Sequence, residues 1–273
     1  MTPTEIKAVM AKIGGTANKH LGQHFLIDNK ALEIVVESAD IKKGDRVLEI
    51  GPGLGVLTSA LLERGAEVIA IEKDRRFADN LSKIYGLELH IGDASKNDWD
   101  SIVGIKPWKF VSNLPYAITS LALRKALYAK NPPTIIVVLV QREVAERVLA
   151  RDGKMSLLSL MVKLASTDAD IIRRVPAGAF YPPPKVESAI LKIMPTSHES
   201  RVTTWGIEPE EVMKMAKQGF AHPRKLLQRN LGIENGKWQE LSKQIGFDVK
   251  TRAEDLKVEQ WAELAKTNKG SGE

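Results

Sequence analysis

The sequence predicts an α/β protein in which a doubly wound, Rossmann-like sheet is followed by a small all-helical C-terminal domain. Two observations carry this prediction. Between residues 46 and 140, short apolar segments alternate with helical stretches of about 10 to 15 residues, which is the pattern of βαβ units. Beyond the polar, proline-containing segment 194–210, the apolar residues recur only at helical spacing. We therefore predict two domains, 1–198 and 199–273.

Five apolar segments are predicted to form parallel strands: RVLEIG (46–51), EVIAIE (67–72), LELHIGDA (87–94), KFVSNLPY (109–116) and TIIVVLV (134–140). Crossovers between parallel strands are right-handed, so the intervening helices should cover both faces of the sheet. Two more apolar segments, in 157–175 and 187–194, are predicted to form an antiparallel pair of strands that completes the sheet edge.

The C-terminal domain is predicted to contain helical segments at 210–220, 223–231, 236–246 and 257–267. Pro223 is expected at the start of the second helix, because proline suits the first helical position. No strand pattern interrupts these segments, so this domain should be entirely helical.

The composition is that of an ordinary globular protein, with 43% hydrophobic and 27% charged residues in a chain of 273. The absence of cysteine excludes disulfides, thiolate metal sites and cysteine nucleophiles, and no metal site is predicted. A net charge of +6 and a pI of about 9.3 favour an anionic partner such as nucleic acid.

The longest apolar runs, such as the one at 134–140, are shorter than the roughly 18 to 20 residues that cross a bilayer. The first 20 residues lack the apolar core of a signal peptide and contain no arginine. We therefore expect a cytoplasmic protein without a membrane span, and a monomer.

A glycine-rich turn follows the first predicted strand, with Gly51, Gly53 and Gly55 in LEIGPGLGVL. Glycine lets the backbone approach a ligand closely, and the start of the next helix offers free N–H groups. Glu72, about 20 residues after Gly51, is placed to accept both hydroxyls of a ribose. Asp93, at the end of the third strand, can accept a hydrogen bond from an adenine amine. The alternatives are a ligand-free turn and acids that only cap helices.

Two nucleoside cofactors fit such a site, a nicotinamide dinucleotide and S-adenosylmethionine. A dinucleotide fingerprint reads GxGxxG and places a pyrophosphate on the helix N-terminus. Here the glycines read GxGxG and follow Glu49, whose carboxylate suits the cationic end of a ligand better than a pyrophosphate. The sequence therefore favours S-adenosylmethionine.

The segment NLPY ends the fourth predicted strand and, taken alone, is also a plausible turn. Together with six other blocks in the same order, it resembles the ribosomal RNA adenine dimethyltransferases, relatives of the erythromycin-resistance methyltransferases. The blocks are HLGQHFL (20–26), EIGPGLG (49–55), IEKD (71–74), GDA (92–94), NLPY (113–116), QREVAERV (141–148) and FYPPPKVESAI (180–190). The resemblance extends from about residue 19 to about residue 231 and implies a class I methyltransferase sheet in the first domain.

The resemblance implies a cofactor site that consists of Gln23, His24, Leu26, Gly51, Gly53, Glu72, Asp93 and Asn113. Gly51 would lie beneath the methionine part of the cofactor, and Asn113 beside the methyl group. Glu72 and Asp93 would bind the ribose and the adenine. His24 departs from the asparagine that is common among bacterial members.

The resemblance also implies that NLPY binds the target adenine. The side-chain oxygen of Asn113 and the carbonyl of Leu114 would accept the two amine hydrogens, while Pro115 stiffens that carbonyl. Positioning and electrostatics, rather than a general base, would then carry the reaction. Tyr116 would stack on one face of the adenine and Phe180 on the other. The alternative for Phe180 is an aromatic ring at the edge of the core.

In the C-terminal domain, Arg224, Lys225 and Arg229 form a cationic cluster that can neutralise phosphates. Charge alone fits a solvated helix face equally well, and the resemblance favours ribosomal RNA. It implies N6-dimethylation of two adjacent adenosines near the 3′ end of small-subunit ribosomal RNA, on immature small subunits, in ribosome biogenesis. Two alternatives remain: an assembly factor with secondary catalysis, and a large-subunit RNA methyltransferase of the macrolide-resistance type.

Overall fold

The computed structural model describes residues 1–18 and 21–269 and divides the chain into two compact units. The first unit comprises Met1–Ala145 and Asp168–Pro195, and the second comprises Glu146–Thr167 and the residues from Thr196 onward. The predicted boundary at residue 198 assigns segment 146–167 to the first domain, whereas in the structure this segment packs with the C-terminal helices. His20, the first residue of the HLGQHFL block, lies outside the described residues.

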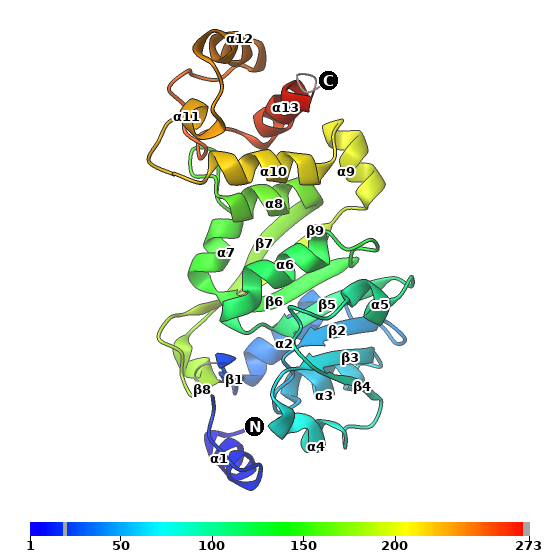
Figure 1. Ribbon diagram of the computed structural model, residues 1–273. Helices are drawn as coiled ribbons and strands as arrows, with labels where there is room; N and C mark the ends of the chain where they lie inside the picture. Colours follow the sequence, from blue (N-terminus) through cyan, green and yellow to red (C-terminus); the bar gives the residue numbers. More distant parts are fainter. Residues whose placement is uncertain (19–20, 270–273) are drawn as a thin grey trace. The chain divides into compact units, whose positions relative to one another are not determined.

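A seven-stranded sheet forms the centre of the first unit, in the order β4-β3-β2-β5-β6-β9-β7 (Figure 1). Its strands are β2 (Arg46–Ile50), β3 (Glu67–Glu72), β4 (Leu87–Ile91), β5 (Trp108–Asn113), β6 (Ile135–Gln141), β7 (Ser166–Val175) and β9 (Ser188–Pro195). Strands β2 to β6 pair in parallel, and β9 pairs antiparallel with β6. The predicted doubly wound sheet is confirmed, with two further strands at one edge.

The strand order reverses between β2 and β5, because β3 and β4 extend the sheet on one side and β6 extends it on the other. In open α/β sheets, such a reversal opens a crevice outside the carboxyl ends of the strands. The glycine turn, Glu72, Asp93 and Asn113 all lie at these carboxyl ends. The topology therefore brings four separate parts of the sequence to one edge of the sheet.

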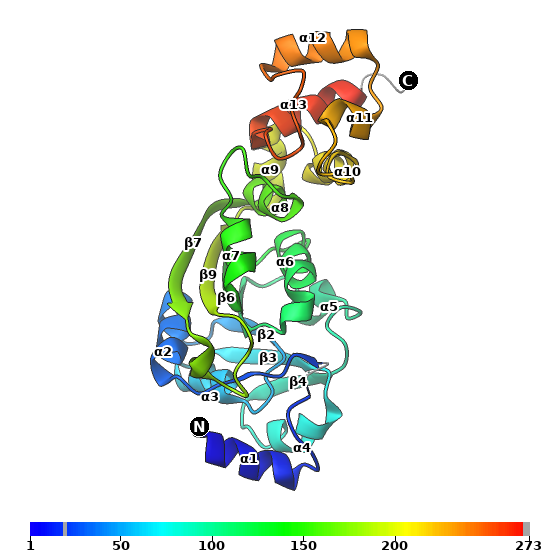
Figure 2. The ribbon, with the colours of Figure 1, turned by 90° about the vertical axis from the view of Figure 1, so that its left-hand side faces the viewer.

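Helices cover both faces of this sheet. Figure 2 shows α2 (Asn29–Ser38) and α3 (Val56–Glu63) on one face, and α5 (Trp99–Val103) and α6 (Thr119–Leu127) on the other. The short helix α4 (Ala78–Leu81) follows β3, and α7 (Arg142–Val148) follows β6. Asp28 caps the start of α2, where its Oδ1 accepts hydrogen bonds from the N–H groups of Lys30 and Ala31.

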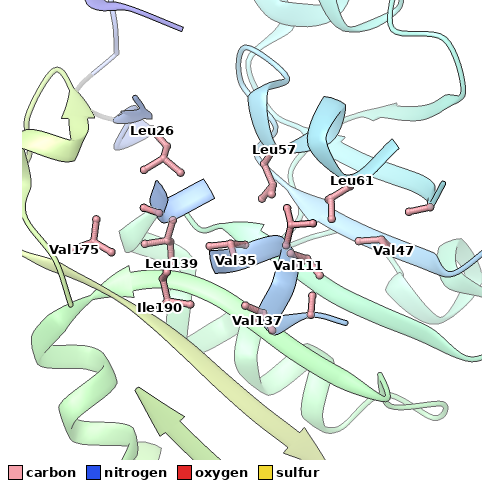
Figure 3. Packing of buried hydrophobic residues seen from close by; sticks show 14 of the residues in the cluster. Leu26, Val35, Val47, Leu57, Leu61, Val111, Val137, Leu139, Val175 and Ile190 are labelled. Atoms are coloured by element: carbon pink, nitrogen blue, oxygen red, sulfur yellow. The ribbon is translucent and has the colours of Figure 1, made fainter. Parts of the chain in front are cut away.

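The main core lies between the sheet and the helices α2 and α3 (Figure 3). Aliphatic side chains dominate it, among them Leu26, Val35, Val47, Leu57, Leu61, Val111, Val137, Leu139, Val175 and Ile190. Six of the seven residues of β6 are buried, because a central strand is covered on both faces. Each fully buried Val, Leu or Ile contributes about 1.5 to 3 kcal/mol, which makes this core the main source of the unit's stability.

An N-terminal helix, α1 (Pro3–Lys12), precedes the sheet and was not predicted. The chain then enters the first unit through the short strand β1 (Phe25–Leu26), which pairs antiparallel with β8 (Phe180–Tyr181). Side chains alternate along a strand. Leu26 and Phe180 therefore enter the main core, while Phe25 and Tyr181 face a smaller cluster that includes Phe77.

From His198 onward, the described helices and strands of the second unit are all helices, as predicted for the C-terminal domain. The unit's helices are α8 (Leu157–Ala165), α9 (His198–Trp205), α10 (Pro209–Gly219), α11 (Leu227–Leu231), α12 (Asn235–Ile245) and α13 (Val258–Lys269). Buried Trp238 and Trp261 anchor α12 and α13. Within residues 1–18 and 21–269, no helix combines the length and the apolar character needed to cross a membrane.

Two predicted elements were wrong. Residues 157–165, predicted as part of a strand, form α8, because Ser156 and Ser159 make a reciprocal capping box that starts a helix. Most residues of α8 are buried, so the sequence shows no polar face from which a helical period can be recognised. Pro223 does not start a helix but lies in a turn, and α11 begins at Leu227.

Candidate active site

A cavity of about 280 Å³ lies at the carboxyl ends of β2, β3, β4 and β5. Its lining includes all residues predicted to bind the cofactor, namely Gln23, His24, Leu26, Gly51, Gly53, Glu72, Asp93 and Asn113. Leu114, Pro115 and Tyr116 line the same cavity. The residues that the sequence suggested for the cofactor and for the target base therefore share one space.

The glycine turn approaches its neighbours too closely for side chains. Gly51 and Gly53 have φ angles of +70° and +56°, in the left-handed region that favours glycine. A Cβ atom at position 51 would lie 3.1 Å from Cγ of Pro115, and one at position 53 would lie 3.1 Å from Cε1 of Phe25. The turn therefore leaves bare backbone along the cavity, where a ligand can approach it.

Glu72, the last residue of β3, is 5% exposed, and backbone N–H groups hold its carboxylate in place. Its Oε2 accepts a hydrogen bond from the Gly53 N–H at 3.0 Å, and its Oε1 accepts one from the Asp74 N–H at 2.7 Å. Burial raises the pKa of this carboxyl. Each oxygen has a second lone pair, so the oriented pair can accept two adjacent hydroxyls, as a ribose offers.

Asp93 follows β4 and is held in the ionised state. Its Oδ1 accepts hydrogen bonds from the N–H and the Oγ of Ser95, and Lys73 Nζ lies 2.9 Å from its Oδ2. These hydrogen bonds, first that of Ser95 and then that of Lys73, lower the pKa of the carboxyl well below its ordinary value. An ionised acceptor at this end of the cavity suits an exocyclic amine.

Glu49, in the strand that precedes the glycine turn, also lines the cavity and is 1% exposed. Its Oε2 accepts a hydrogen bond from Thr58 Oγ1 at 2.6 Å. Burial raises its pKa to about 8, and a cation placed beside it would favour the ionised form. This acid therefore matches the positively charged end of a ligand, as the sequence suggested.

Gln23 is fixed by residues that the sequence reading missed. Its Nε2 donates to Asp74 Oδ2 at 2.7 Å, and its Oε1 accepts from the N–H of Asn18 at 2.7 Å. Arg76 completes the group, since its Nη2 lies 2.6 Å from Asp74 Oδ2 and its Nη1 donates to the carbonyl of Thr16. Asp74 belongs to the IEKD block, which was the available hint. The contacts join Thr16, Asn18 and Gln23 to the residues that follow β3.

Asn113 lines the cavity from the last position of β5. Its Nδ2 donates to the backbone carbonyl of His24 at 3.2 Å. A carbonyl can only accept, so this bond identifies Nδ2 as the atom that faces His24. Among the described residues, none donates a hydrogen bond to Oδ1, which can therefore accept one from a ligand.

Tyr116 is half-buried and held at both its tip and its face. Its hydroxyl lies 2.7 Å from Oγ of Ser188, and its ring stacks against that of His24 with centroids 5.8 Å apart. Burial raises the pKa of the Tyr116 hydroxyl, so it stays protonated at neutral pH. Ser188 is a further residue that the sequence reading missed.

Phe180 is not brought to the cavity. Its ring is 2% exposed, belongs to the main core and is absent from the cavity lining. The cause is the pairing of β8 with β1, which turns the Phe180 side chain to the same side as its partner Leu26. The predicted stack of this ring on the target base has no support in this geometry.

The donor and acceptor groups along the cavity match one ligand from end to end. Glu49 suits a cationic amino-acid end, Glu72 suits a ribose, and Asp93 suits an adenine amine. A doubly wound sheet with this set at its switch point defines the class of methyltransferases that use S-adenosylmethionine.

Comparison with known proteins narrows the class to a family. The profile of the family described as ribosomal RNA adenine dimethylase matches residues 14–269. The ribosomal RNA small subunit methyltransferase A of Dehalococcoides mccartyi is 40% identical over 257 residues, which cover 91% of this chain and 87% of the relative. The protein of the same name from Nostoc sp. is 36% identical over 264 residues, which cover 90% and 96%. The chain belongs to the ribosomal RNA adenine dimethylase family.

Solved structures agree with this assignment. A dimethyladenosine transferase from Plasmodium falciparum has a TM-score of 0.71 and 26% identity, and the match covers 91% of this chain and 98% of that chain. The 23S rRNA methyltransferase ErmE has a TM-score of 0.66 and 24% identity over 89% and 98% of the two chains, which shows the shared fold. The chain is therefore an S-adenosylmethionine-dependent enzyme that methylates adenine in ribosomal RNA.

The predicted RNA-binding cluster lies in the second unit. Arg224 and Lys225 are in the turn before α11, Arg229 is in α11, and all three are exposed. In the described part of the chain, no hydrogen bond or ion pair engages these side chains. They are free to meet phosphates.

Proposed function

We propose that this enzyme dimethylates N6 of two adjacent adenosines near the 3′ end of small-subunit ribosomal RNA, on immature small subunits during ribosome biogenesis. The names of the relatives, which specify the small subunit, support this target. The observation that carries the chemistry is the Asn113 amide, whose nitrogen is committed to the His24 carbonyl. Asn113 Oδ1 is therefore the atom that we propose to accept a hydrogen bond from the substrate amine.

The adenine amine is a poor nucleophile because its lone pair is delocalised into the ring. Asn113 Oδ1 and the Leu114 carbonyl supply two acceptors for its two N–H bonds. Among the described residues, none donates a hydrogen bond to the Leu114 carbonyl. Binding both hydrogens out of the ring plane returns the lone pair to the nitrogen and directs it away from the two acceptors.

When bound, S-adenosylmethionine supplies an activated methyl group. The chain holds the amine in line with it, because Pro115 packs on Gly51 and fixes the backbone that carries the Leu114 carbonyl. After transfer, the positively charged nitrogen loses a proton to solvent without a dedicated base. A monomethylated amine keeps one N–H bond for the same acceptors, which permits a second transfer.

The target base has to leave its stack before it can reach this cavity. Tyr116 offers it an aromatic face, and a base–aromatic stack is worth roughly 1 to 3 kcal/mol. The Ser188 hydroxyl holds that ring by its phenol group. Arg224, Lys225 and Arg229 are the residues that we propose for contact with RNA phosphates. We further propose that the enzyme acts as a monomer in the cytoplasm.

The test is incubation with labelled S-adenosylmethionine and undermodified small subunits, followed by nucleoside analysis of the RNA. We expect labelled N6-dimethyladenosine in small-subunit RNA. Label confined to large-subunit RNA would indicate the macrolide-resistance type of activity, and label confined to DNA or protein would overturn the proposal.

Asn113→Ala tests the assigned site, with the exposed Asn29→Ala as a matched control. We expect Asn113→Ala to abolish labelling and Asn29→Ala to leave it unchanged. Subunit binding retained by the inactive Asn113→Ala variant would support a second role in subunit assembly. Undiminished labelling by that variant would contradict the assignment of the acceptor.

A further inference from the structure

We propose that Arg76 is a positioning residue for S-adenosylmethionine: it ties the N-terminal segment, residues 1–18, to the turn after β3 and so holds Gln23 and Glu72 in place. Arg76 does not line the cavity, so it acts through these two residues and not by contact with the cofactor. The inference rests on the proposed cofactor site, to which Gln23 and Glu72 belong. It adds a residue that lies outside all the sequence blocks of that site.

The guanidinium of Arg76 forms a forked ion pair with Asp74. Its Nε lies 2.9 Å from Oδ1, and its Nη2 lies 2.6 Å from Oδ2. Asp74 is buried, and the hydrogen bonds from Arg76 lower the pKa of its carboxyl, so the carboxylate is ionised at neutral pH. A two-point pair between arginine and a carboxylate fixes orientation as well as charge. Arg76 therefore determines where the Asp74 carboxylate points.

Asp74 in turn holds both proposed cofactor residues. Its Oδ2 accepts a hydrogen bond from Gln23 Nε2 at 2.7 Å, and its backbone N–H donates to Glu72 Oε1 at 2.7 Å. One residue thus orients an amide and a carboxylate that line the cavity. A displacement of Asp74 would therefore disturb two groups of the proposed cofactor site at once.

The other edge of the guanidinium reaches the N-terminal segment. Arg76 Nη1 donates to the backbone carbonyl of Thr16 at 3.2 Å. It also lies against Gly15, where an added Cβ atom would clash with Nη1. Gly15 is not among the glycines with a positive φ angle. Close packing against Arg76, and not a special backbone conformation, is therefore what favours glycine at this position.

Helix α1 attaches the same segment to the same turn by apolar contacts. Ile6 and Met10 of α1 are buried in the small cluster that contains Phe77, the residue after Arg76. Phe77 also lines the cavity. Because these apolar contacts do not involve the guanidinium, loss of Arg76 should loosen the polar tie and leave α1 and the sheet folded.

Two variants test the tie, each with a matched control. Arg76→Gln removes the ion pair, and the exposed Arg75→Gln removes the neighbouring charge. Gly15→Ala keeps the arginine but pushes Nη1 off the Thr16 carbonyl, which the end of a flexible side chain allows at little cost to the fold. Gly178→Ala is its control, since Gly178 also has no positive φ angle and a Cβ atom there would meet nothing within 4 Å.

For each variant we would measure the Kd of S-adenosylmethionine by calorimetry, thermal unfolding, and kcat and the KM of S-adenosylmethionine with undermodified small subunits. We expect Arg76→Gln to raise Kd and KM roughly fivefold or more, as loss of about one hydrogen bond's stabilisation implies, with kcat unchanged at saturating cofactor. Gly15→Ala should raise the Kd by a smaller factor. Both controls should keep the wild-type Kd.

An unchanged Kd in folded Arg76→Gln, an equal rise in Arg75→Gln, or a loss of kcat at an unchanged Kd would overturn the inference. An unchanged Kd in Gly15→Ala would overturn the tie to the N-terminal segment. Glu72→Ala should raise the Kd, and an unchanged Kd there would overturn the cofactor-site assignment together with the inference. Calorimetry needs no RNA, so a failure of the proposed RNA target in the labelling experiment is distinguishable from a failure of this inference.

Discussion

Pro115 rests directly on Gly51: a Cβ atom at position 51 would lie 3.1 Å from Cγ and 3.3 Å from Cδ of the proline ring. These residues follow neighbouring parallel strands, Gly51 after β2 and Pro115 after β5. The contact joins the glycine turn of the cofactor site to the NLPY segment of the base site. A displacement of one segment therefore displaces the other.

Gly51→Ala should reduce both the affinity for S-adenosylmethionine and the rate of methyl transfer, roughly tenfold or more, because the new methyl group pushes Pro115 away. The φ angle of +70° adds a backbone penalty of about 1 to 2 kcal/mol in the free energy of unfolding. Calorimetry, single-turnover methylation and urea unfolding measure the three effects.

Gly44→Ala is the matched control for this variant. Gly44 has a φ angle of +85°, but a Cβ atom there would meet nothing within 4 Å. It should lose stability and keep both cofactor affinity and rate. Equal losses of affinity in the two variants would show that backbone strain, and not the contact with Pro115, is responsible.

Glu49 makes stability depend on pH. Its carboxyl titrates near 4.5 in the unfolded chain and at about 8 in the folded protein, where burial favours the protonated form. The folded state therefore holds a proton between these values that the unfolded state has released. The contribution of Glu49 to the free energy of unfolding is fully present below the pKa of the unfolded chain. It is lost as the pH rises through the pKa of the folded protein.

For the protein without cofactor, we expect the free energy of unfolding to fall between about pH 5 and 8, by up to ~1.4 kcal/mol per pH unit for one such group. Glu49→Gln should make this slope shallower. Glu72, whose pKa is raised in the same direction, leaves a residual slope. Urea unfolding at a series of pH values measures the slope of the free energy of unfolding against pH for both proteins. Equal slopes in the wild type and Glu49→Gln would mean that Glu49 is ionised in the folded protein.

The hydrogen bond between Tyr116 and Ser188 should show strong coupling in a double-mutant cycle. Ser188 is fully buried, so Tyr116→Phe leaves its hydroxyl without its partner, at a cost of about 1 to 3 kcal/mol. Ser188→Ala leaves the phenol unpaired in the same way. The double variant should lose less stability than the sum of the two single variants, because neither partner remains. Additive losses in urea unfolding would contradict the coupling.

The sequence was sufficient to predict that the proposed cofactor residues lie together at one edge of the sheet, and the reason is topological. Glu72 and Asp93 each end a parallel strand, and the carboxyl ends of neighbouring strands meet at one edge whatever the details of packing. Because the alternation of strands and helices is a local pattern, the doubly wound sheet was equally accessible from sequence.

The contacts that orient these residues could not be predicted from the sequence. Arg76 reaches Thr16, and Tyr116 reaches Ser188, across long separations in sequence. The side to which Phe180 turns is set by a two-residue pairing with β1, which has no sequence pattern of its own. For α8, burial on nearly all sides removed the polar face that distinguishes a helix from a strand.

The cationic cluster of the second unit should control the salt dependence of RNA binding. Replacing Arg224, Lys225 and Arg229 by glutamine should weaken binding to undermodified small subunits. Each lost phosphate contact should make the slope of log K against log salt shallower by about 0.7 to 0.9, because fewer counterions are released. Binding titrations at several salt concentrations measure this slope.

A second triple variant, with glutamine at Lys30, Lys83 and Lys106, removes the same number of exposed charges from the first unit. It should change the slope less than the first variant, since net charge alone acts through long-range attraction that salt screens. Equal slopes in the two variants would assign the effect to net charge. If neither variant changes the slope, the RNA binds to another surface of the protein. Phosphates that contact the cluster release counterions, so removal of the three charges would have to make the slope shallower.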